Sequence, residues 1–407
     1  MDVSRVRIAL TSAMFIGVLM GIAAPHAWGF PFGGFAPQQT FSAGFSPLSI
    51  ATGDLNGDGA LDLAVADDSA GTVSILLGDG AGSFTTQTLF TSGIGARSIA
   101  LGDLNGDGAL DLVVTTEFSN VVSVQLGDGV GGFGSQQTFP VGYFPYAVAL
   151  GYLNGDSALD LAVVNQGDDT VSILLGDGAG GFAPQHFFQV GVAPYSIAMG
   201  DLNGDGALDI ATSNLGASGV FILLGDGVGG FTPGPASPLV GPDPFSIAIG
   251  DLNGDGALDI ATANNSGSNV SILLGDGVGG FAPEQTFPVG NRPSSISIGD
   301  LDGDGDLDLA VTNDNMNGSV SVLLRDSAGS YSPQQPLIVG QLPSFITEGD
   351  FNGDNALDLV VANELDADIS ILLNQTFVCI SSSDLNGDGV VNGVDLAIVL
   401  NNWGPAP

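Results

Sequence analysis

A nonapeptide rich in oxygen-bearing side chains recurs along this 407-residue chain. Its first copy, from Asp54 to Asp62, reads Asp-Leu-Asn-Gly-Asp-Gly-Ala-Leu-Asp. It offers side-chain oxygens at positions 1, 3, 5 and 9 and a backbone carbonyl at position 7. Calcium binds about six to eight such hard oxygen ligands, and clustered carboxylates repel one another unless a cation lies among them. The pattern therefore predicts a Ca²⁺-binding loop. The plainer alternative, a solvated acidic turn, does not account for so many copies in register.

The nonapeptide recurs at a nearly constant spacing of 49 or 50 residues. Further copies begin at Asp103, Tyr152, Asp201, Asp251, Asp300 and Asp350. This period is typical of propeller blades and exceeds that of helical solenoid repeats. We predict metal ligation by the oxygen-bearing side chains at positions 1, 3, 5 and 9 of these copies. They are Asp54, Asn56, Asp58, Asp62, Asp103, Asn105, Asp107, Asp111, Asn154, Asp156, Asp160, Asp201, Asn203, Asp205, Asp209, Asp251, Asn253, Asp255, Asp259, Asp300, Asp302, Asp304, Asp308, Asp350, Asn352, Asp354 and Asp358.

Three copies depart from the common pattern. The third has Tyr152 in place of the first aspartate and Ser157 in place of the glycine, so we expect its site to be weak or empty. The seventh has Asn355 in place of that glycine, which asparagine can replace because it tolerates left-handed backbone. The sixth, Asp300 to Asp308, is the most acidic and is expected to bind Ca²⁺ most tightly.

Four short apolar runs in each unit must position these loops. In the unit around Asp251 they are Ser246–Gly250, Leu258–Ala263, Val270–Leu274 and Phe281–Phe287, separated by Gly, Asp, Asn or Pro turn signals. We name them strands A, B, C and D in chain order. No segment of the repeat region has the length and period of a helix. Seven units of four strands predict an all-β, seven-bladed β-propeller over residues 30–374.

The chain ends predict how the ring closes. The seventh unit stops after its third strand, whereas residues 33–44 nearly copy residues 279–290, which contain a strand D. The N-terminal segment is therefore expected to supply the last blade's fourth strand. This removes the exposed edges that an open ring would leave.

The unit consensus, Ser-Ile-Ala-x-Gly-Asp-Leu-Asn-Gly-Asp-Gly-x-Leu-Asp, resembles the FG-GAP/VCBS-type repeat found in integrin α chains and in many exported bacterial proteins. The resemblance extends over nearly all of residues 34–374. It implies a propeller with Ca²⁺ in the loop that joins strands A and B. It leaves the function open, because this fold serves adhesion, lectin-like and enzyme-accessory roles.

The two ends of the chain predict separate segments. Residues 1–29 combine Arg5 and Arg7, an apolar run and a small-residue cleavage site, which indicates an export signal; an uncleaved anchor is the alternative. After a linker at residues 375–383, residues 384–404 resemble a single dockerin-like EF-hand repeat, a twelve-residue calcium loop followed by a short helix. Its side-chain ligands would be Asp384, Asn386, Asp388, Asn392 and Asp395. Dockerins normally carry two repeats, so a calcium-folded tail is the favoured interpretation of this module.

Charge and composition exclude several classes of function. A formal charge of −39 excludes an electrostatic nucleic-acid binder. Cys379 is the only cysteine, so no intrachain disulfide forms, and no apolar segment after residue 29 is long enough to span a membrane. Once residues 1–29 are removed, His186 is the only histidine, which leaves no catalytic triad. We therefore expect a secreted or cell-surface, monomeric protein that is not an enzyme.

The most variable part of the units lies between strand D and the next strand A. The residues that we predict to bind a ligand there are Arg97, Tyr146, Tyr195, Phe245, Arg292 and Phe345. The alternative is that these rings wedge between blades. The expected function is binding or adhesion to a protein or cell-surface ligand. A lectin-like carbohydrate binder, or an accessory domain of a polysaccharide-degrading system attached through the C-terminal module, is the alternative.

Overall fold

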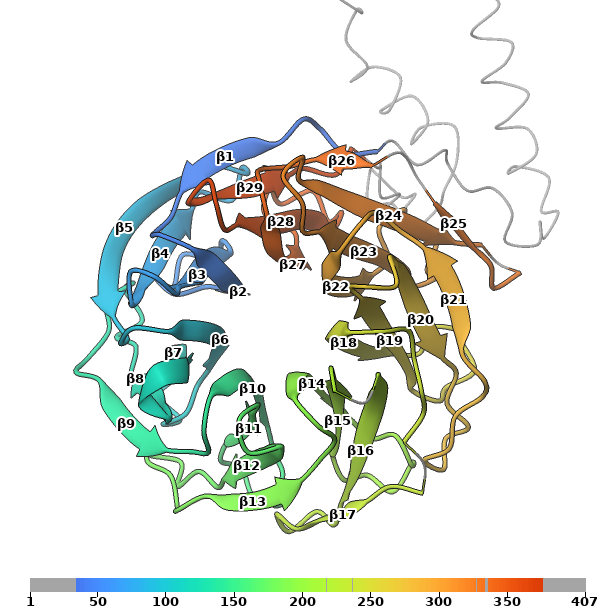
Figure 1. Cartoon of the computed structure of the whole chain (residues 1–407). Coiled ribbons are helices and arrows are strands. Elements are labelled where there is room, and N and C mark those ends of the chain that lie inside the picture. Colours follow the sequence, from blue (N-terminus) through green and yellow to red (C-terminus); the bar gives the residue numbers. More distant parts are fainter. Residues whose placement is uncertain (1–33, 217, 236, 327, 334–335, 376–407) are drawn as a thin grey trace, which may run out of the picture.

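The computed structural model describes residues 34–375, apart from 217, 236, 327 and 334–335. These residues form seven antiparallel sheets arranged as blades around a central channel, which confirms the all-β, seven-bladed propeller (Figure 1). The predicted export signal, the C-terminal calcium module and all but the first residue of the linker lie outside the described residues. In the part that is described, the helical structure is a single 3-10 turn, η1 (Glu117–Ser119), and no helix is long and apolar enough to cross a membrane.

Each blade has four main strands, ordered from the channel outward as A to D. The A strands are β2 (Pro47–Gly53), β6 (Ala96–Gly102), β10 (Pro145–Gly151), β14 (Pro194–Gly200), β18 (Pro244–Gly250), β22 (Pro293–Gly299) and β27 (Pro343–Gly349). The B strands are β3 (Asp62–Asp67), β7 (Asp111–Thr116), β11 (Asp160–Asn165), β15 (Asp209–Asn214), β19 (Asp259–Asn264), β23 (Asp308–Asn313) and β28 (Asp358–Asn363).

The two outer positions complete the blades. The C strands are β4 (Thr72–Gly78), β8 (Val121–Gln125), β12 (Thr170–Leu174), β16 (Gly219–Gly225), β20 (Asn269–Leu273), β24 (Ser319–Arg325) and β29 (Asp368–Leu372). The D strands are β5 (Phe84–Thr91), β9 (Gln137–Pro140), β13 (His186–Gln189), β17 (Phe231–Pro233), β21 (Gln285–Pro288), β25 (Tyr331–Pro333) and β1 (Gln39–Ser42). A short strand, β26 (Leu337–Ile338), also pairs with β24.

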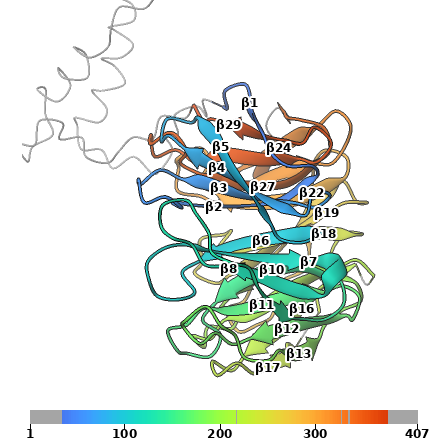
Figure 2. The ribbon, with the colours of Figure 1, turned by 90° about the vertical axis from the view of Figure 1, so that its left-hand side faces the viewer.

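Loops gather at two opposite ends of the blades (Figure 2). The A–B loops, which carry the nonapeptides, share one end with the C–D turns. Backbone hydrogen bonds join them across blades; for example, Gly131 N–H donates to the Leu55 carbonyl at 2.9 Å. The D–A and B–C loops share the other end, where Gln166 N–H donates to the Phe144 carbonyl at 2.9 Å. We call these the acidic-loop face and the variable face.

The N-terminal strand closes the ring as predicted. β1 pairs antiparallel with β29 through Gln39–Ile371 to Ser42–Asp368, so residues from the start of the propeller complete the last blade. Phe41 of β1 then packs edge-to-face on Phe84 of the first blade, with ring centroids 5.4 Å apart. Closure is therefore made by side-chain packing as well as by the backbone ladder.

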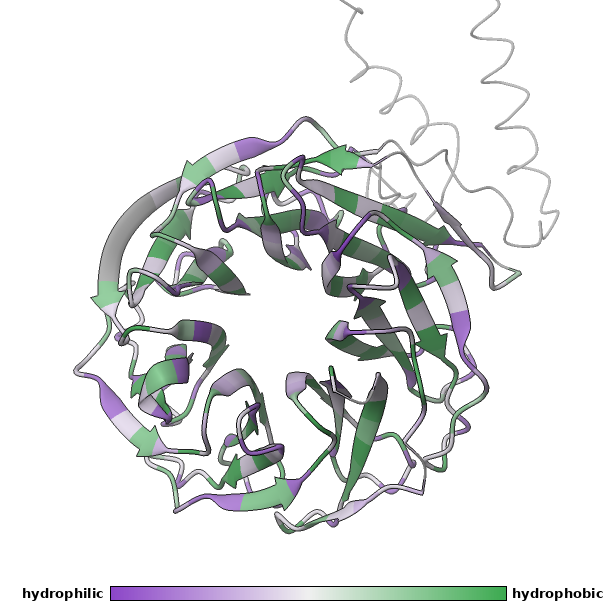
Figure 3. Cartoon of the chain, in the orientation of Figure 1, coloured by the Kyte–Doolittle hydropathy of each residue, from purple (hydrophilic) through white to green (hydrophobic). Residues whose placement is uncertain are grey.

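The hydrophobic clusters lie between blades. One cluster joins blades 1 and 2 through Ala64, Ile75, Ile99 and Leu112, and each of the other six clusters likewise draws on two neighbouring blades. The B strands are buried along their whole length, which explains their almost continuous apolar sequences (Figure 3).

The outer strands are shorter than the sequence predicts. Phe281 only forms an isolated bridge with Gly275, and β21 begins at Gln285. Pro283 lies between them and has no N–H to donate to strand C, so the ladder is interrupted there. The prediction of one continuous D strand over 281–287 is therefore wrong, although its place in the blade is correct.

Replacing Phe41 with alanine tests the closure. The substitution removes the ring that packs on Phe84 while leaving the backbone ladder of β1 intact. We expect the free energy of unfolding to fall by about 2–3 kcal/mol, somewhat less than for a fully buried phenylalanine, as measured by chemical denaturation in saturating Ca²⁺. Thr40→Ala, on the exposed side of the same strand, is the control and should change stability by less than about 0.5 kcal/mol.

Candidate functional site

Backbone hydrogen bonds to the first aspartate organise each complete acidic loop. In the first loop, Asp54 Oδ1 accepts from Gly57 N–H at 2.7 Å and Oδ2 accepts from Gly59 N–H at 2.9 Å. Asp58 N–H donates to Asn56 Oδ1 at 2.9 Å, and the Asn56 side-chain amide donates to Asp58 Oδ2 at 3.0 Å. Positions 1, 3 and 5 are therefore held on one short turn.

The ninth-position aspartate has a different environment. Asp62 is the first residue of β3 and is fully buried; its Oδ2 accepts from Leu55 N–H and its Oδ1 from Gly78 N–H, both at 2.8 Å. It thus ties the loop to the end of strand C. The other six blades repeat this arrangement, with Asn374 or Arg325 N–H as the strand C donor in two of them.

The sixth loop brings three carboxylates close together. Among the described residues, oxygens of Asp300, Asp302 and Asp304 lie within 4.8 Å of one another. Burial and the neighbouring Asp304 and Asp300 carboxylates raise the pKa of Asp302 to about 6. All three ligands are hard oxygens, as Ca²⁺ requires, and a bound cation would relieve their repulsion. The fourth of the five acids of this loop, Asp306, forms an ion pair with Arg325.

The third and seventh loops, whose sequences depart from the common pattern, differ in how closely they keep its geometry. In the third loop, Tyr152 is 54% exposed and supplies no carboxylate, so the loop lacks the acceptor that organises the others. Ser157 also does not adopt the positive φ of its glycine counterparts, whereas Asn355 of the seventh loop does, with φ 66°. The seventh loop keeps the common geometry, and the third does not.

A ring of side chains surrounds the channel mouth on the variable face. In six blades, the second residue of strand A lies at a register irregularity with strand B, where an extra residue is accommodated. These residues are Leu48, Tyr146, Tyr195, Phe245, Ser294 and Ser344, and they line a cavity of about 170 Å³ together with Arg97 at the corresponding place in β6. They belong to the A strands and not to the preceding loops.

Strand A of the seventh blade places two residues at the mouth. The counterpart in the seventh blade is Ser344, six residues before the nonapeptide, as in every other unit. Phe345 follows it; it also lines the cavity but packs against the hydrophobic cluster between blades 7 and 1.

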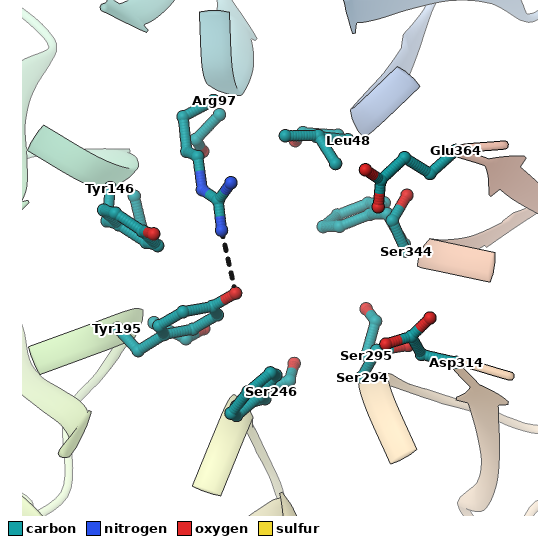
Figure 4. Close-up of a pocket in the computed structure, with 16 residues that line it drawn as sticks. Leu48, Arg97, Tyr146, Tyr195, Ser246, Ser294, Ser295, Asp314, Ser344 and Glu364 are labelled. Carbon is teal, nitrogen blue, oxygen red and sulfur yellow. Dashed lines mark hydrogen bonds between the residues drawn. The ribbon is translucent and has the colours of Figure 1, made fainter. Parts of the chain in front are cut away.

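The predicted aromatic residues contact one another around the mouth. The rings of Tyr195 and Phe245 stack with centroids 4.7 Å apart, and Tyr146 packs against Tyr195 at 4.8 Å. The Arg97 guanidinium lies 4.0 Å from the Tyr146 ring centre and donates to the Tyr195 hydroxyl at 2.9 Å (Figure 4). The structure thus brings five of the six predicted ligand-binding residues to the mouth, since Phe345 also lines the cavity.

Acidic side chains lie on the opposite side of the mouth. Glu364 and Asp314, each the first residue after a B strand, line the cavity across from Arg97 (Figure 4). Burial and the neighbouring Asp314 raise the pKa of Glu364. Asp314 pairs with Arg292 at 2.8 Å; Arg292 itself is 60% exposed and does not line the cavity.

Asp314 and Glu364 line the mouth but were not among the residues predicted to bind a ligand. A sequence signal for both exists, because they lie 14 residues after the start of their nonapeptides. The same offset gives Asp68 and Glu117 in the first two blades. Burial raises the pKa of each of these two carboxyls, and the nearby Arg97 opposes the rise.

Comparison with known protein families identifies the repeats. The FG-GAP-like repeat family matches residues 54–114, 106–163, 152–212, 251–311 and 300–361, which together span more than half of the chain. The chain belongs to the FG-GAP-like repeat family. A comparison with curated proteins gave no match.

Solved structures of low identity share the fold of this FG-GAP-like protein. Virginiamycin B lyase from Staphylococcus aureus is 15% identical, with a TM-score of 0.56 over 83% of this chain and 99% of the lyase. BBS1N, solved in complex with ARL6DN, is 13% identical, with a TM-score of 0.61 over 84% and 97%. An Agrocybe aegerita lectin that recognises non-reducing terminal N-acetylglucosamine is 19% identical, with a TM-score of 0.50 over 79% and 86%. At these identities the similarity concerns the fold alone.

One FG-GAP-like unit places a carboxyl where the others place no charge. Glu348 is the residue before the last glycine of β27, and its counterparts are Thr52, Leu101, Leu150, Met199, Ile249 and Ile298. Its Oε2 is buried and has no hydrogen-bond partner among the described residues. Burial raises the pKa of Glu348 to about 7.

Glu348 should make stability depend on pH. The unfolded chain ionises this carboxyl near its ordinary pKa of 4.5 and the folded chain near 7, so the folded state binds the proton more tightly and the Glu348 contribution falls as pH rises between these values. Glu348→Gln should therefore be more stable than the parent by about 2 kcal/mol at pH 8 and nearly equal to it at pH 4. Denaturant titrations in saturating Ca²⁺ measure this difference; a gap that does not change with pH would contradict the assignment.

Proposed function

We propose that this protein is an exported, calcium-stabilised propeller that acts as a non-catalytic binding or adhesion module, with its ligand bound at the channel mouth of the variable face. The observation that carries the proposal is the uneven distribution of aromatic and acidic residues around the mouth. Aromatic residues occupy its ring in blades 3, 4 and 5, whereas acids follow strand B in blades 6, 7, 1 and 2. A ring required only for folding would repeat the same residue seven times.

The charges at the mouth support recognition of a polar ligand. Arg97 contacts Tyr146 and Tyr195 but has no carboxylate within 4.0 Å among the described residues. The Glu364 carboxylate likewise has no cation within that distance in the described part of the chain. A cavity with separated, unneutralised charges and aromatic walls is typical of a site with a few well-placed polar groups for a ligand.

Calcium is proposed as a structural component. In the sixth loop, Asp300, Asp302 and Asp304 would hold it, and in the other complete loops the residues at positions 1, 3 and 5 would do so. Ca²⁺ supplies positive charge among carboxylates that otherwise repel one another. A protein without an intrachain disulfide gains from such a site the stability that exported proteins often obtain from cystines.

The absence of a catalytic role is also part of the proposal. The one histidine among the described residues, His186, lies on the exposed outer strand β13, so the serines of the mouth have no histidine base beside them. Similarity to virginiamycin B lyase at 15% identity supports a shared fold and does not extend to the reaction that the lyase catalyses.

Chelation tests the calcium proposal. Adding EGTA should lower the melting temperature, and Ca²⁺ but not equal Mg²⁺ should restore it, because a ligand that binds only the folded state stabilises that state. Native mass spectrometry should detect about six or seven ions. The double variant Tyr152→Asp, Ser157→Gly restores the missing acceptor and glycine of the third loop and should add one ion. An unchanged melting curve would refute the proposal.

Substitutions at the mouth test the binding proposal. Tyr195→Ala removes both the partner of Arg97 and the ring that stacks on Phe245, so binding to glycan and peptide arrays should fall by at least about tenfold. Val278→Ser, at an exposed position on the acidic-loop face, should bind as the parent does. Equal binding by both variants would place the site elsewhere. Turnover of a bound glycan that disappears in Glu364→Gln would show catalysis instead.

A further inference from the structure

A second cavity lies on the variable face, at the outer rim between blades 2 and 3. It measures about 590 Å³, and we call it the rim groove. Blade 2 and the loop after it contribute Asn120 and residues 140–143, and blade 3 contributes Asp168, Thr170, Gln185, Phe187 and Gln189. None of these residues belongs to the channel mouth or to an acidic loop.

Two aromatic side chains border the rim groove and are exposed. Tyr143 is 62% exposed and Phe187 is 67% exposed. The position of Phe187 is occupied by Thr40, Thr138 and Thr286 in three other blades. No other unit places aromatic residues at both positions. Exposed rings at the edge of a polar cavity indicate a binding surface, since nothing in the blade requires them there.

Hydrogen bonds orient the polar side chains of the groove but leave some of their donor and acceptor atoms unpaired. Asn120 Oδ1 accepts from Phe144 N–H at 3.3 Å, which leaves its amide N–H groups free. Asp168 Oδ2 accepts from Tyr143 N–H at 2.7 Å, which leaves Oδ1 free. Gln185 Oε1 accepts from the Ser172 hydroxyl, which again leaves an amide donor. The groove therefore presents fixed donors and an acceptor beside two aromatic faces.

The rim groove and the channel mouth are joined by one short segment. Tyr143 lines the groove and Tyr146 lines the mouth, so their Cα atoms are at most about 11 Å apart. Between them, Phe144 is 44% exposed and has a φ of 53°, a strained conformation for a bulky residue. Aromatic residues thus lie at both cavities and on the segment between them.

We propose that the rim groove and the channel mouth are two subsites for one oligosaccharide, which crosses Tyr143 and Phe144. This inference rests on the proposed function, because it takes the mouth as the first subsite. A sugar ring has an apolar C–H face that packs on aromatic rings and hydroxyl edges that match mixed donors and acceptors. Asp168, Asp314 and Glu364, in a chain of charge −39, select neutral or amino sugars over polyanions.

The experiment measures binding of cello-, chito- and manno-oligosaccharides of one to six units to the full chain in Ca²⁺, by titration calorimetry. Affinity should rise with length until both subsites are filled. Tyr143→Asn and Phe187→Thr, which introduce residues found at these positions in other blades, should each weaken binding of the hexamers by at least about fivefold. Neither variant should alter binding of the shortest sugar that the mouth retains. Phe45→Asn, at the same position as Tyr143 but in blade 1, is the matched control.

The outcomes separate this inference from the proposed function. If Tyr195→Ala weakens binding but Tyr143→Asn and Phe187→Thr do not, the mouth is a binding site and the two-subsite proposal is wrong. If the groove variants weaken binding and Tyr195→Ala does not, the mouth has no part in binding and both proposals fall. Binding of peptides with no binding of any sugar series overturns the oligosaccharide assignment. Melting temperatures equal to the parent's show that the variants are folded.

Discussion

Packing between blades is the constraint on which the rest of this structure depends. Every hydrophobic cluster draws its side chains from two neighbouring blades. A single blade therefore cannot bury its apolar faces alone, and an open ring would expose two of them. Pairing of β1 with β29 removes both open faces at once. The same constraint keeps the B and C strands nearly identical from unit to unit, so differences between units are confined to the loops and strand ends.

The two faces of the ring differ in how much their loops vary from unit to unit. On the acidic-loop face, C–D turns donate to the preceding blade's A–B loop in five places, and the side chains of Arg325 and Asn374 replace that bond in blades 6 and 7. The nonapeptides hold 22 of the 44 acidic residues, so about half of the negative charge belongs to turns that link blades. The loops of this face are uniform because each A–B loop accepts a hydrogen bond from the neighbouring blade. On the variable face, the repeated backbone bond instead joins the residue after each B strand to the D–A loop that precedes the same blade, and the side chains of these loops differ from blade to blade.

The fold was predictable because its signals are local and repeated. The period, the four apolar runs and the copied strand at residues 33–44 are all present in the sequence, and they specify blade number, strand order and closure. Mouth residues such as Tyr146 and Tyr195 were predictable because they recur at one offset. The start of β21 was not predicted, because it depends on a proline that interrupts pairing. The rim groove was not predictable, because Asn120 and Phe187 come from different units and meet only in three dimensions.

The small residues of the ring matter as much as the aromatic ones. In blades 6 and 7 the mouth position holds Ser294 and Ser344, whose hydroxyls donate to the carbonyls of Pro343 and Pro47 in the next blade at 2.7 and 2.8 Å. These serines are thus occupied by holding the ring together, and their size leaves space in front of Asp314 and Glu364. Tyr146, Tyr195 and Phe245 fill the corresponding space on the other side. The cavity is polar on one side and aromatic on the other because seven equivalent positions carry different residues on an otherwise uniform scaffold.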